Sequence, residues 1–405
     1  MYNEKQIEKL IEPILINERK REGIILSKLA DRLKQIGTLS PSDIQTLINV
    51  KNMSRKDTKQ INEELAKLSK LSEKEIKKII KTVAGSDYLE AKPFYDYRSK
   101  TFIPYEENID LQRRIKAIEN LTLQDFRNIS NTTAFMVRDI TNPLIIKPTK
   151  LSKMYSDILD YAITSVTSGL GTYNTVIPEI IRTMVDRGIN TVEYESATGR
   201  KTHRRVDSAV KNTILNGIRQ VQQGVQDLVG EEIGSDGVEI SVHENSAPDH
   251  EPIQGHQFTN EEYEKLQTQE DFEDTNNITF LAIERPIGMW NCRHFVMRII
   301  LGHKTPNYSL EELEKIKERN ANGITYINRK GEQVTQSKYW CTQKINQYEQ
   351  DIRELKEMQK IAEKAFNEEV AKKYDTQVRQ MIDKYTSFCK LSGLNTGYTN
   401  LRVYV

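Results

Sequence analysis

The chain has 405 residues, with 59 basic and 58 acidic side chains, 37% hydrophobic residues and three cysteines. This length predicts two or three structural units, and the net charge of +1 excludes a global field that would attract nucleic acid or a membrane. No apolar run approaches the roughly 20 residues that span a bilayer, and three widely spaced cysteines argue against a disulfide framework. We therefore expect a protein made in the cytoplasm and used there or in an assembly formed there.

Residues 1–130 are predicted to form an N-terminal helical module. Apolar residues recur at helical spacing, as at Leu26, Leu29 and Leu33. Residues that begin capping-box sequences, and glycines suited to helix ends, divide the stretch into several helices. The caps are Ser54, Ser72 and Thr122, and the glycines are Gly37 and Gly85.

Residues 131–234 are predicted to be a central helical region with a short hairpin. Helical patterns cover 154–166 and 176–187, and a longer one runs from 207 to 228. Between them, alternating segments flank Thr198 and Gly199, which is typical of two short strands joined by a turn.

Two segments of the chain are rich in basic residues. The favoured interpretations are an exposed helix face for the first and a solvated hairpin tip for the second. For the second segment, the alternative is contact with DNA phosphates or with an acidic partner surface. The first segment contains Lys67, Lys70, Lys74, Lys77, Lys78 and Lys81, interleaved with Glu73 and Glu75. The second contains Arg200, Lys201, His203, Arg204 and Arg205.

Residues 235–305 change character and are predicted to form a small α/β module. Val238, Ile240 and Val242 alternate with polar residues, as in a half-buried strand. The apolar run at 278–283 predicts a second strand.

Residues 306–405 are predicted to form a hairpin and a long helical arm. Ser309 is suited to cap a short helix, and Lys330 and Gly331 mark a β-turn. A charged helix is expected from 335 to 374 or beyond. We favour its packing as a helical hairpin with 376–391 over a free arm that binds a partner. The predicted fold class is mainly α with a small α/β (α+β) module and long helices at both ends.

A cluster of scarce side chains lies in the α/β module, where 243–294 holds four of the six histidines and one of the three cysteines. The favoured interpretation is a hydrogen-bonded knot, in which Asn245 and Asn291 supply turn bonds and Gly255 and Gly288 allow tight backbone geometry. A second interpretation is a zinc site, since histidine and cysteine are the usual ligands of zinc. A third is a Cys292 nucleophile with His250 or His243 as its base. The candidate zinc ligands are His243, His250, Cys292 and His294.

The same residues carry a resemblance. Their order is similar to the pattern of the phage minor capsid protein 2 family, which is related to the head-morphogenesis proteins of the phage Mu F type. The resemblance covers most of the chain. The matching residues are His243, Asn245, Pro248, His250, Gln254, Gly255, Gly288, Asn291, Cys292, Arg293 and His294.

The resemblance implies a minor structural protein of a tailed-phage head, made in the bacterial host cytoplasm and present in the virion or procapsid interior. Its implied partners are the portal protein and other head proteins, with a weak contact to packaged DNA. It implies no enzymatic activity, no membrane, no small-molecule substrate and no cofactor, with zinc as the exception that the ligand set leaves open. The competing hypothesis is a Cys/His or metal-dependent enzyme of phage assembly or DNA ejection, with a hydrolase built on Cys292 and His250 as its simplest form.

Overall fold

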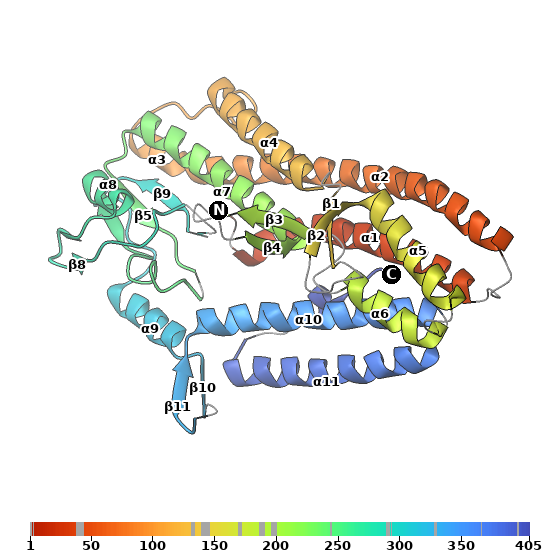
Figure 1. The fold of residues 1–405 in the computed structure, drawn as a ribbon. Coiled ribbons are helices and arrows are strands. Elements are labelled where there is room, and N and C mark those ends of the chain that lie inside the picture. The colour runs from red at the N-terminus through yellow and green to blue at the C-terminus, as the bar shows by residue number, and fades with distance from the viewer. Residues whose placement is uncertain are drawn as a thin grey trace.

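The computed structural model has a mainly α fold, with a small α/β module and long helices at both ends, which confirms the predicted fold class. The molecule is elongated, and the α/β module lies at one end of the helical body (Figure 1). The structure describes residues 2, 4–37, 44–130, 134–138, 146–168, 172–185, 191–195, 201–243, 245–288, 292, 294–327, 330–365, 367–394 and 397–405.

The N-terminal part contains two long helices and two shorter ones. They are α1 (Glu4–Gly37), α2 (Ile44–Glu90), α3 (Lys92–Tyr97) and α4 (Ile109–Ser130). The predicted helix breaks at Ser54, Ser72 and Gly85 are wrong, because all three lie inside α2, and Thr122 lies inside α4. Ser72 is fully buried and accepts a hydrogen bond from Asn17 of α1 at 3.3 Å, so tertiary contacts replace its capping role.

The central part adds three helices and two hairpins. They are β1 (Ala134–Arg138), β2 (Ile146–Lys150), α5 (Leu151–Thr167), α6 (Tyr173–Val185), β3 (Thr191–Glu195), β4 (Lys201–Arg205) and α7 (Val206–Ile233). The pairing of β3 with β4 confirms the predicted hairpin, whose tip at 196–200 lies outside the described residues. α1 and α7 run through the middle of the body, between α2 and α4 on one side and the C-terminal helices on the other (Figure 1).

The C-terminal part forms an antiparallel helical hairpin preceded by a β-hairpin. Its elements are α9 (Leu310–Ala321), β10 (Ile324–Ile327), β11 (Gln333–Gln336), α10 (Lys338–Lys364), α11 (Glu368–Ser392) and η1 (Tyr398–Leu401). Ser309 caps α9 through a capping box, as predicted. The predicted continuous helix from 335 to 374 is wrong. Asn367 accepts a hydrogen bond from the N–H of Val370 at 3.2 Å and so begins a new helix, which packs back on α10.

The α/β module consists of short strands around one helix. They are β5 (Gly237–Ile240), β6 (Gln257–Thr259), α8 (Asn260–Thr268), β7 (Phe272–Glu273), β8 (Thr279–Phe280) and β9 (Val296–Ile299). β5 is the central strand of an antiparallel sheet of order β6-β5-β9. The predicted second strand at 278–283 is reduced to β8, which pairs with β7 and not with β5. The partner on the other edge of β5 is β9, which the sequence analysis did not predict.

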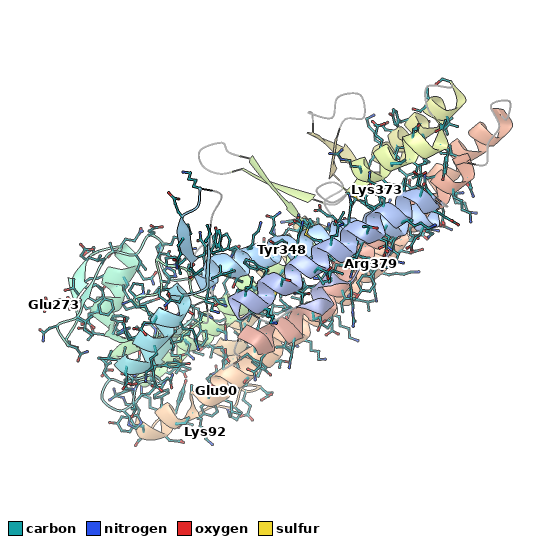
Figure 2. The ribbon with its side chains drawn as sticks, turned by 90° about the horizontal axis from the view of Figure 1, so that it is seen from below. Glu90, Lys92, Glu273, Tyr348, Lys373 and Arg379 are labelled. Carbon is teal, nitrogen blue, oxygen red and sulfur yellow. The ribbon has the colours of Figure 1, made fainter. Side chains whose placement is uncertain are left out.

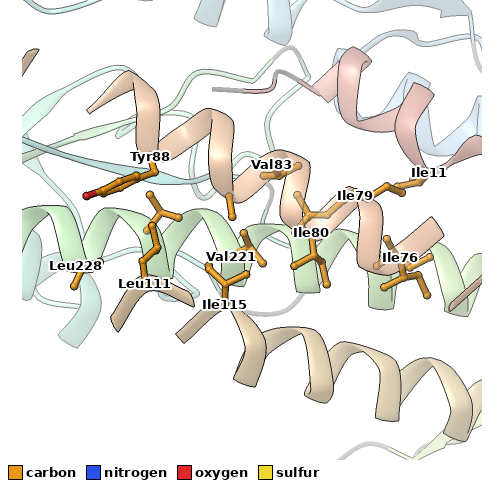
Figure 3. Packing of buried hydrophobic residues seen from close by; sticks show 14 of the residues in the cluster. Ile11, Ile76, Ile79, Ile80, Val83, Tyr88, Leu111, Ile115, Val221 and Leu228 are labelled. Carbon is orange, nitrogen blue, oxygen red and sulfur yellow. The ribbon is translucent and has the colours of Figure 1, made fainter. Parts of the chain in front are cut away.

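Two large apolar cores hold the helical body together, and a smaller one packs α10 against α11. The first joins α1, α2, α3, α4 and α7, and the second joins α1, α2, α5 and α6 with the α10–α11 hairpin. Figure 3 shows isoleucines of α2 facing side chains of α7 and α4, among them Val221 and Ile115. Both large cores draw on segments far apart in the sequence, so the body depends on long-range packing. In the part of the chain that the structure describes, no helix combines the length and apolar character needed to cross a membrane.

A network of six ionisable side chains, three arginines and three carboxyl groups, joins α1, α7 and α10 inside this body. Burial raises the pKa of Glu22 to about 8, so all six are charged only above that pH. Arg205, the last residue of β4, contacts Glu22 at 2.5 Å and Glu357 at 3.1 Å. Asp207 lies 3.6 Å from both Arg19 and Arg353. Burial opposes ionisation of Asp207, but Arg353, Arg205 and Arg19 outweigh it and lower its pKa to about 2.

Arg205 was predicted to belong to a solvated hairpin tip, and this prediction is wrong. Its side chain is only 2% exposed and is enclosed by the network of six ionisable side chains. The side chains of residues 200–204 lie outside the described structure. Because a buried guanidinium needs carboxylate partners, position 205 serves to join helices, and no surface contact can be assigned to it.

Gly217 lets α7 approach α4 closely, and Gly217→Ala is expected to lower the free energy of unfolding by about 1–2 kcal/mol. A Cβ atom at position 217 would lie 2.4 Å from Oγ1 and 2.6 Å from Cγ2 of Thr122. This clash outweighs the helix propensity that alanine adds. Urea unfolding measures the loss, and Thr122→Ala in the same chain should restore most of it by removing both clashing atoms. A single variant as stable as the wild type would contradict the close packing.

Candidate functional site

The candidate site forms where three segments of the α/β module meet. The turns at 247–255 carry His250 and Gln254, and the segment before β9 carries Cys292 and His294. The third segment follows β5 and carries His243. The antiparallel pairing of β5 with β9 brings His243 and His294 side by side.

Ser241 extends this pairing beyond the regular strands. Its N–H donates to the carbonyl oxygen of Phe295 at 3.0 Å, and its Oγ accepts from the N–H of Phe295 at 3.0 Å. His243, two residues further on, therefore faces His294, with ring centroids 4.7 Å apart and the rings nearly perpendicular. The register of the sheet thus decides which of the family-matching residues, here called the signature residues, are neighbours in space.

Cys292, His250 and His294 form the centre of the site. Sγ of Cys292 lies 3.4 Å from Nδ1 of His250 and 3.7 Å from Nδ1 of His294. The three residues are 6%, 1% and 4% exposed, and their ligand-capable atoms all lie within 4.8 Å of one another. Two imidazole nitrogens and one sulfur atom therefore point toward a common buried position.

The outer side of His250 is held by a backbone carbonyl. Its Nε2 lies 2.7 Å from the carbonyl oxygen of Arg285, so this nitrogen carries a proton and donates it. The Arg285 side chain forms a two-pronged ion pair with Asp249, with distances of 2.7 Å and 2.8 Å. This pair fixes the segment that presents the carbonyl, so the orientation of the imidazole ring is determined from outside the cluster.

The outer side of His294 is held by the side-chain amide of Gln254. Oε1 of Gln254 accepts a hydrogen bond from the backbone N–H of His243 at 2.9 Å and lies 3.4 Å from Nε2 of His294. The amide nitrogen of Gln254 donates to Glu251 at 2.9 Å. Asn320, near the end of α9, donates to both oxygens of Glu251 at 3.0 Å and 3.1 Å. Sequence reasoning missed Glu251 and Asn320, because nothing local connects residues 69 positions apart.

The pKa values of the three central residues differ because each has different neighbours. Burial raises the pKa of Cys292, but hydrogen bonds from His250 and from the Gly288 N–H outweigh it, and the net shift is downward. Burial lowers the pKa of His250, but Cys292 and the Arg285 carbonyl outweigh it, and the net shift is upward. Burial, followed by the charges of His243 and His250, holds the pKa of His294 well below its usual value. The cluster therefore combines the Cys292 thiol, whose pKa is lowered, with His250, whose pKa is raised, and with His294, whose pKa is lowered so far that its ring is neutral.

The remaining signature residues shape the backbone around the centre. Gly255 and Gly288 adopt φ angles of +76° and +93°, and Asn245 adopts +63°. A Cβ atom at Gly255 would lie 2.3 Å from a side-chain carbon of Leu313, so this glycine also allows α9 to pack against the site. Pro248 is exposed and lies in the turn before His250. Asn291 and Arg293 lie outside the described residues.

Two other histidines of the module lie apart from the central three. The His243 ring contacts His294, and its Nε2 lies 3.4 Å from the Ser241 hydroxyl, but it is not part of the group whose ligand atoms converge. His256 packs edge-on against Phe280 with ring centroids 5.1 Å apart. Of the four candidate zinc ligands, the structure therefore brings three together and places His243 beside them.

Gln254→Leu is expected to lower the free energy of unfolding by about 1–3 kcal/mol. The change removes the acceptor of the half-buried backbone N–H of His243 and the partner of Glu251, while it keeps a side chain of similar size. Urea unfolding followed by circular dichroism measures the loss. Gln333→Leu, at an exposed position of β11, is the control and should change stability little. An unchanged midpoint in the Gln254 variant would show that this amide does not support the cluster.

These features define a class of protein. The potentially reactive atoms of the cluster are buried, and the body is a set of long helices with charged outer faces. Such a molecule is typical of a structural component that works through contacts with other proteins.

Comparison with known families agrees with this class. A family model described as phage minor capsid protein 2 matches residues 3–390. The chain therefore belongs to the phage minor capsid protein 2 family, as the resemblance implied. Searches of curated proteins and of solved structures find no match. Family membership makes the chain a structural protein of the phage virion, with other head proteins as its partners.

Proposed function

We propose that this minor capsid protein acts in head morphogenesis at or near the portal vertex and is packaged with the DNA. The match over residues 3–390 carries the proposal, together with the resemblance of the signature residues to head-morphogenesis proteins of the Mu F type. The long helical body supports it, because extended helices offer large side surfaces to neighbouring subunits.

The contact with DNA is proposed for one face of α2, here called the lysine face. This face carries eight exposed lysines between Lys56 and Lys81. Each residue advances about 100° around an α-helix, so these eight lysines fall within an arc of about 100° and a length of about 37 Å. Glu63 is the acidic residue within this arc, and the opposite side of α2 is buried. Figure 2 shows α2 along the edge of the molecule. The lysine face consists of Lys56, Lys59, Lys67, Lys70, Lys74, Lys77, Lys78 and Lys81, all exposed.

A row of lysines on a single helix face suits the phosphate backbone of nucleic acid. Such contacts carry no sequence preference and weaken as salt rises, because bound counterions are released. The net charge of +1 gives no long-range attraction, so the proposed contact is local and weak. It would suit a protein that lies against DNA already confined in a head.

The proposed role is structural and not enzymatic. Cys292 and His250 have the facing sulfur and nitrogen atoms of a nucleophile and its base, but they are 6% and 1% exposed. A nucleophile must reach its substrate, so this burial favours support of the module over hydrolysis. Loss of an assembly or ejection activity in Cys292→Ala, with fold and particle incorporation intact, would instead support the competing hypothesis.

Location is tested by tagging the protein in phage-producing cells. Mass spectrometry would be applied both to the proteins that co-purify with it and to finished particles. We expect recovery of the portal protein and presence of the tagged chain in particles at low copy number. Presence in particles without portal contact would restrict the proposal to a head protein located elsewhere. Absence from both would overturn it.

The DNA contact is tested with two matched variants of equal charge change. In the first, Lys70, Lys74, Lys77 and Lys81 of the lysine face become glutamine. In the control, the same change is made at Lys372, Lys373, Lys384 and Lys390, which are exposed on α11. The slope of log affinity against log salt for duplex DNA should fall by up to about 0.9 per lost phosphate contact in the first variant only. Equal slopes in both would exclude the lysine face.

A further inference from the structure

The position enclosed by Cys292, His250 and His294 has the dimensions of a metal site. Zinc bonds of about 2.3 Å to sulfur and about 2.0–2.1 Å to nitrogen, at a tetrahedral angle, place the two ligand atoms about 3.5 Å apart. In the cluster, Sγ of Cys292 lies 3.4 Å from one Nδ1 and 3.7 Å from the other. Both separations match a shared ion, and the ligand-capable atoms of the three residues lie within 4.8 Å of one another.

The hydrogen-bond network determines which nitrogen of each ring is free to bind a metal. The backbone N–H of His243 donates to Oε1 of Gln254, which fixes the orientation of that side-chain amide. Its oxygen therefore faces Nε2 of His294, and this nitrogen must carry the ring proton. Nε2 of His250 donates to the Arg285 carbonyl in the same way. When both rings are neutral, each turns the lone pair of Nδ1 toward Cys292.

This arrangement leaves one proton for two nitrogen lone pairs. Whether that proton lies on Cys292 or on Nδ1 of His250, it bridges the sulfur atom and only one Nδ1, and the lone pair of the other Nδ1 would remain buried without a strong partner. Such a group costs about 1–3 kcal/mol. A divalent cation bound to a thiolate satisfies both lone pairs and the sulfur atom at once.

The surroundings of the two histidines are those of metal ligands. Histidines that bind a metal through one nitrogen usually donate the other N–H to a carbonyl or carboxylate, which holds the ring in place. Here the acceptors are the Arg285 carbonyl and the Gln254 amide oxygen, and they are themselves held by Asp249 and Glu251. Two imidazoles and a thiolate favour zinc over magnesium or calcium, which prefer oxygen ligands.

We propose that His250 and His294, through Nδ1, and Cys292, through its thiolate, bind a zinc ion that joins the turns at 247–255 to the segment before β9. A water molecule completes the coordination, because His243 lies beside the converging atoms and not among them. The proposal does not depend on the position of the protein in the head.

The test measures zinc in the full-length protein produced in zinc-supplemented medium. We expect about one zinc ion per chain in the wild type and in His243→Ala, and less than about a tenth of that in Cys292→Ser and His294→Asn. Cys389→Ser and His303→Asn are matched controls, since Cys389 lies in the α10–α11 hairpin and His303 is exposed. Both controls should keep the metal. Zinc retained by Cys292→Ser would overturn the proposal.

A second measurement avoids variants that fail to fold. The wild type is stripped with a chelator and titrated with Co²⁺, whose visible spectrum reports its coordination. We expect the intense bands of tetrahedral cobalt and a sulfur-to-cobalt charge-transfer band, which excess Zn²⁺ should remove. A spectrum identical to that of the aqueous ion, together with zinc-free wild-type protein, would show that the cluster is a metal-free knot.

Discussion

Arg205→Met is expected to lower the free energy of unfolding by about 3–5 kcal/mol. The guanidinium of Arg205 contacts Glu22 at 2.5 Å and Glu357 at 3.1 Å, and all three side chains are less than a tenth exposed. Methionine is of similar length, so little packing is lost. Two buried carboxylates, however, are left without the cation between them. Urea unfolding at pH 9, where Glu22 is ionised, measures the change.

The charge balance of the network provides the control for this prediction. At pH 9, above the pKa of about 8 of Glu22, the wild-type network has three cations and three anions, and Arg205→Met leaves two cations against three anions. Adding Glu357→Gln restores the balance, so the double variant should recover part of the lost stability. Arg113→Met removes an exposed partner of Asp110 on α4 and should change stability little. If the Arg205 and Arg113 variants were equally stable, the buried network would have no role in joining the helices.

The second large effect is a dependence of stability on pH that arises from Glu18. Burial raises the pKa of Glu18 from 4.5 to about 7, against the opposing charge of Arg21. The folded protein therefore keeps this proton at pH values where the unfolded chain has lost it. Stability from this residue is fully present below pH 4.5 and falls as the pH rises to about 7. Between pH 5 and pH 8 the loss should be about 2–3 kcal/mol.

Glu18→Gln tests this dependence because glutamine cannot ionise. The free energy of unfolding of the variant, measured in urea at pH 5 and at pH 8, should fall less with rising pH than that of the wild type. Glu63→Gln, at an exposed position of α2, should leave the wild-type dependence unchanged. Asp207 acts at the opposite end of the scale, since its pKa of about 2 makes its contribution disappear only in strong acid. Identical dependences in the Glu18 variant and the wild type would contradict a raised pKa.

The helices and hairpins that depend on local signals were predictable. The Ser309 capping box and the hairpin at β10 and β11 lie where their residues indicate, because caps and turns are formed by neighbours in the chain. The breaks predicted at Ser72 and Gly85 failed because α2 packs along α1, α4 and α7. Packing over the whole length of a helix outweighs a single capping residue.

The membership of the candidate site was predictable only in part. Scarce histidines and a cysteine in a short stretch pointed to His250, Cys292 and His294, which the fold brings together. The supporting partners Glu251 and Asn320 gave no signal, because α9 reaches the site only through tertiary packing. The separation of His243 from the central three likewise follows from the register of β5 and β9, which residue spacing does not specify.

The sequence by itself determined the mainly helical class, the small α/β module and the phage minor capsid family, since composition, periodicity and motif order are properties of the chain. Only the tertiary structure decided that Arg205 is buried among carboxylates and that two Nδ1 atoms face one sulfur atom. Burial and ring orientation depend on residues many positions away. The electrostatic energy of a charge and the free nitrogen of a histidine are therefore set by the folded environment and not by the residue type.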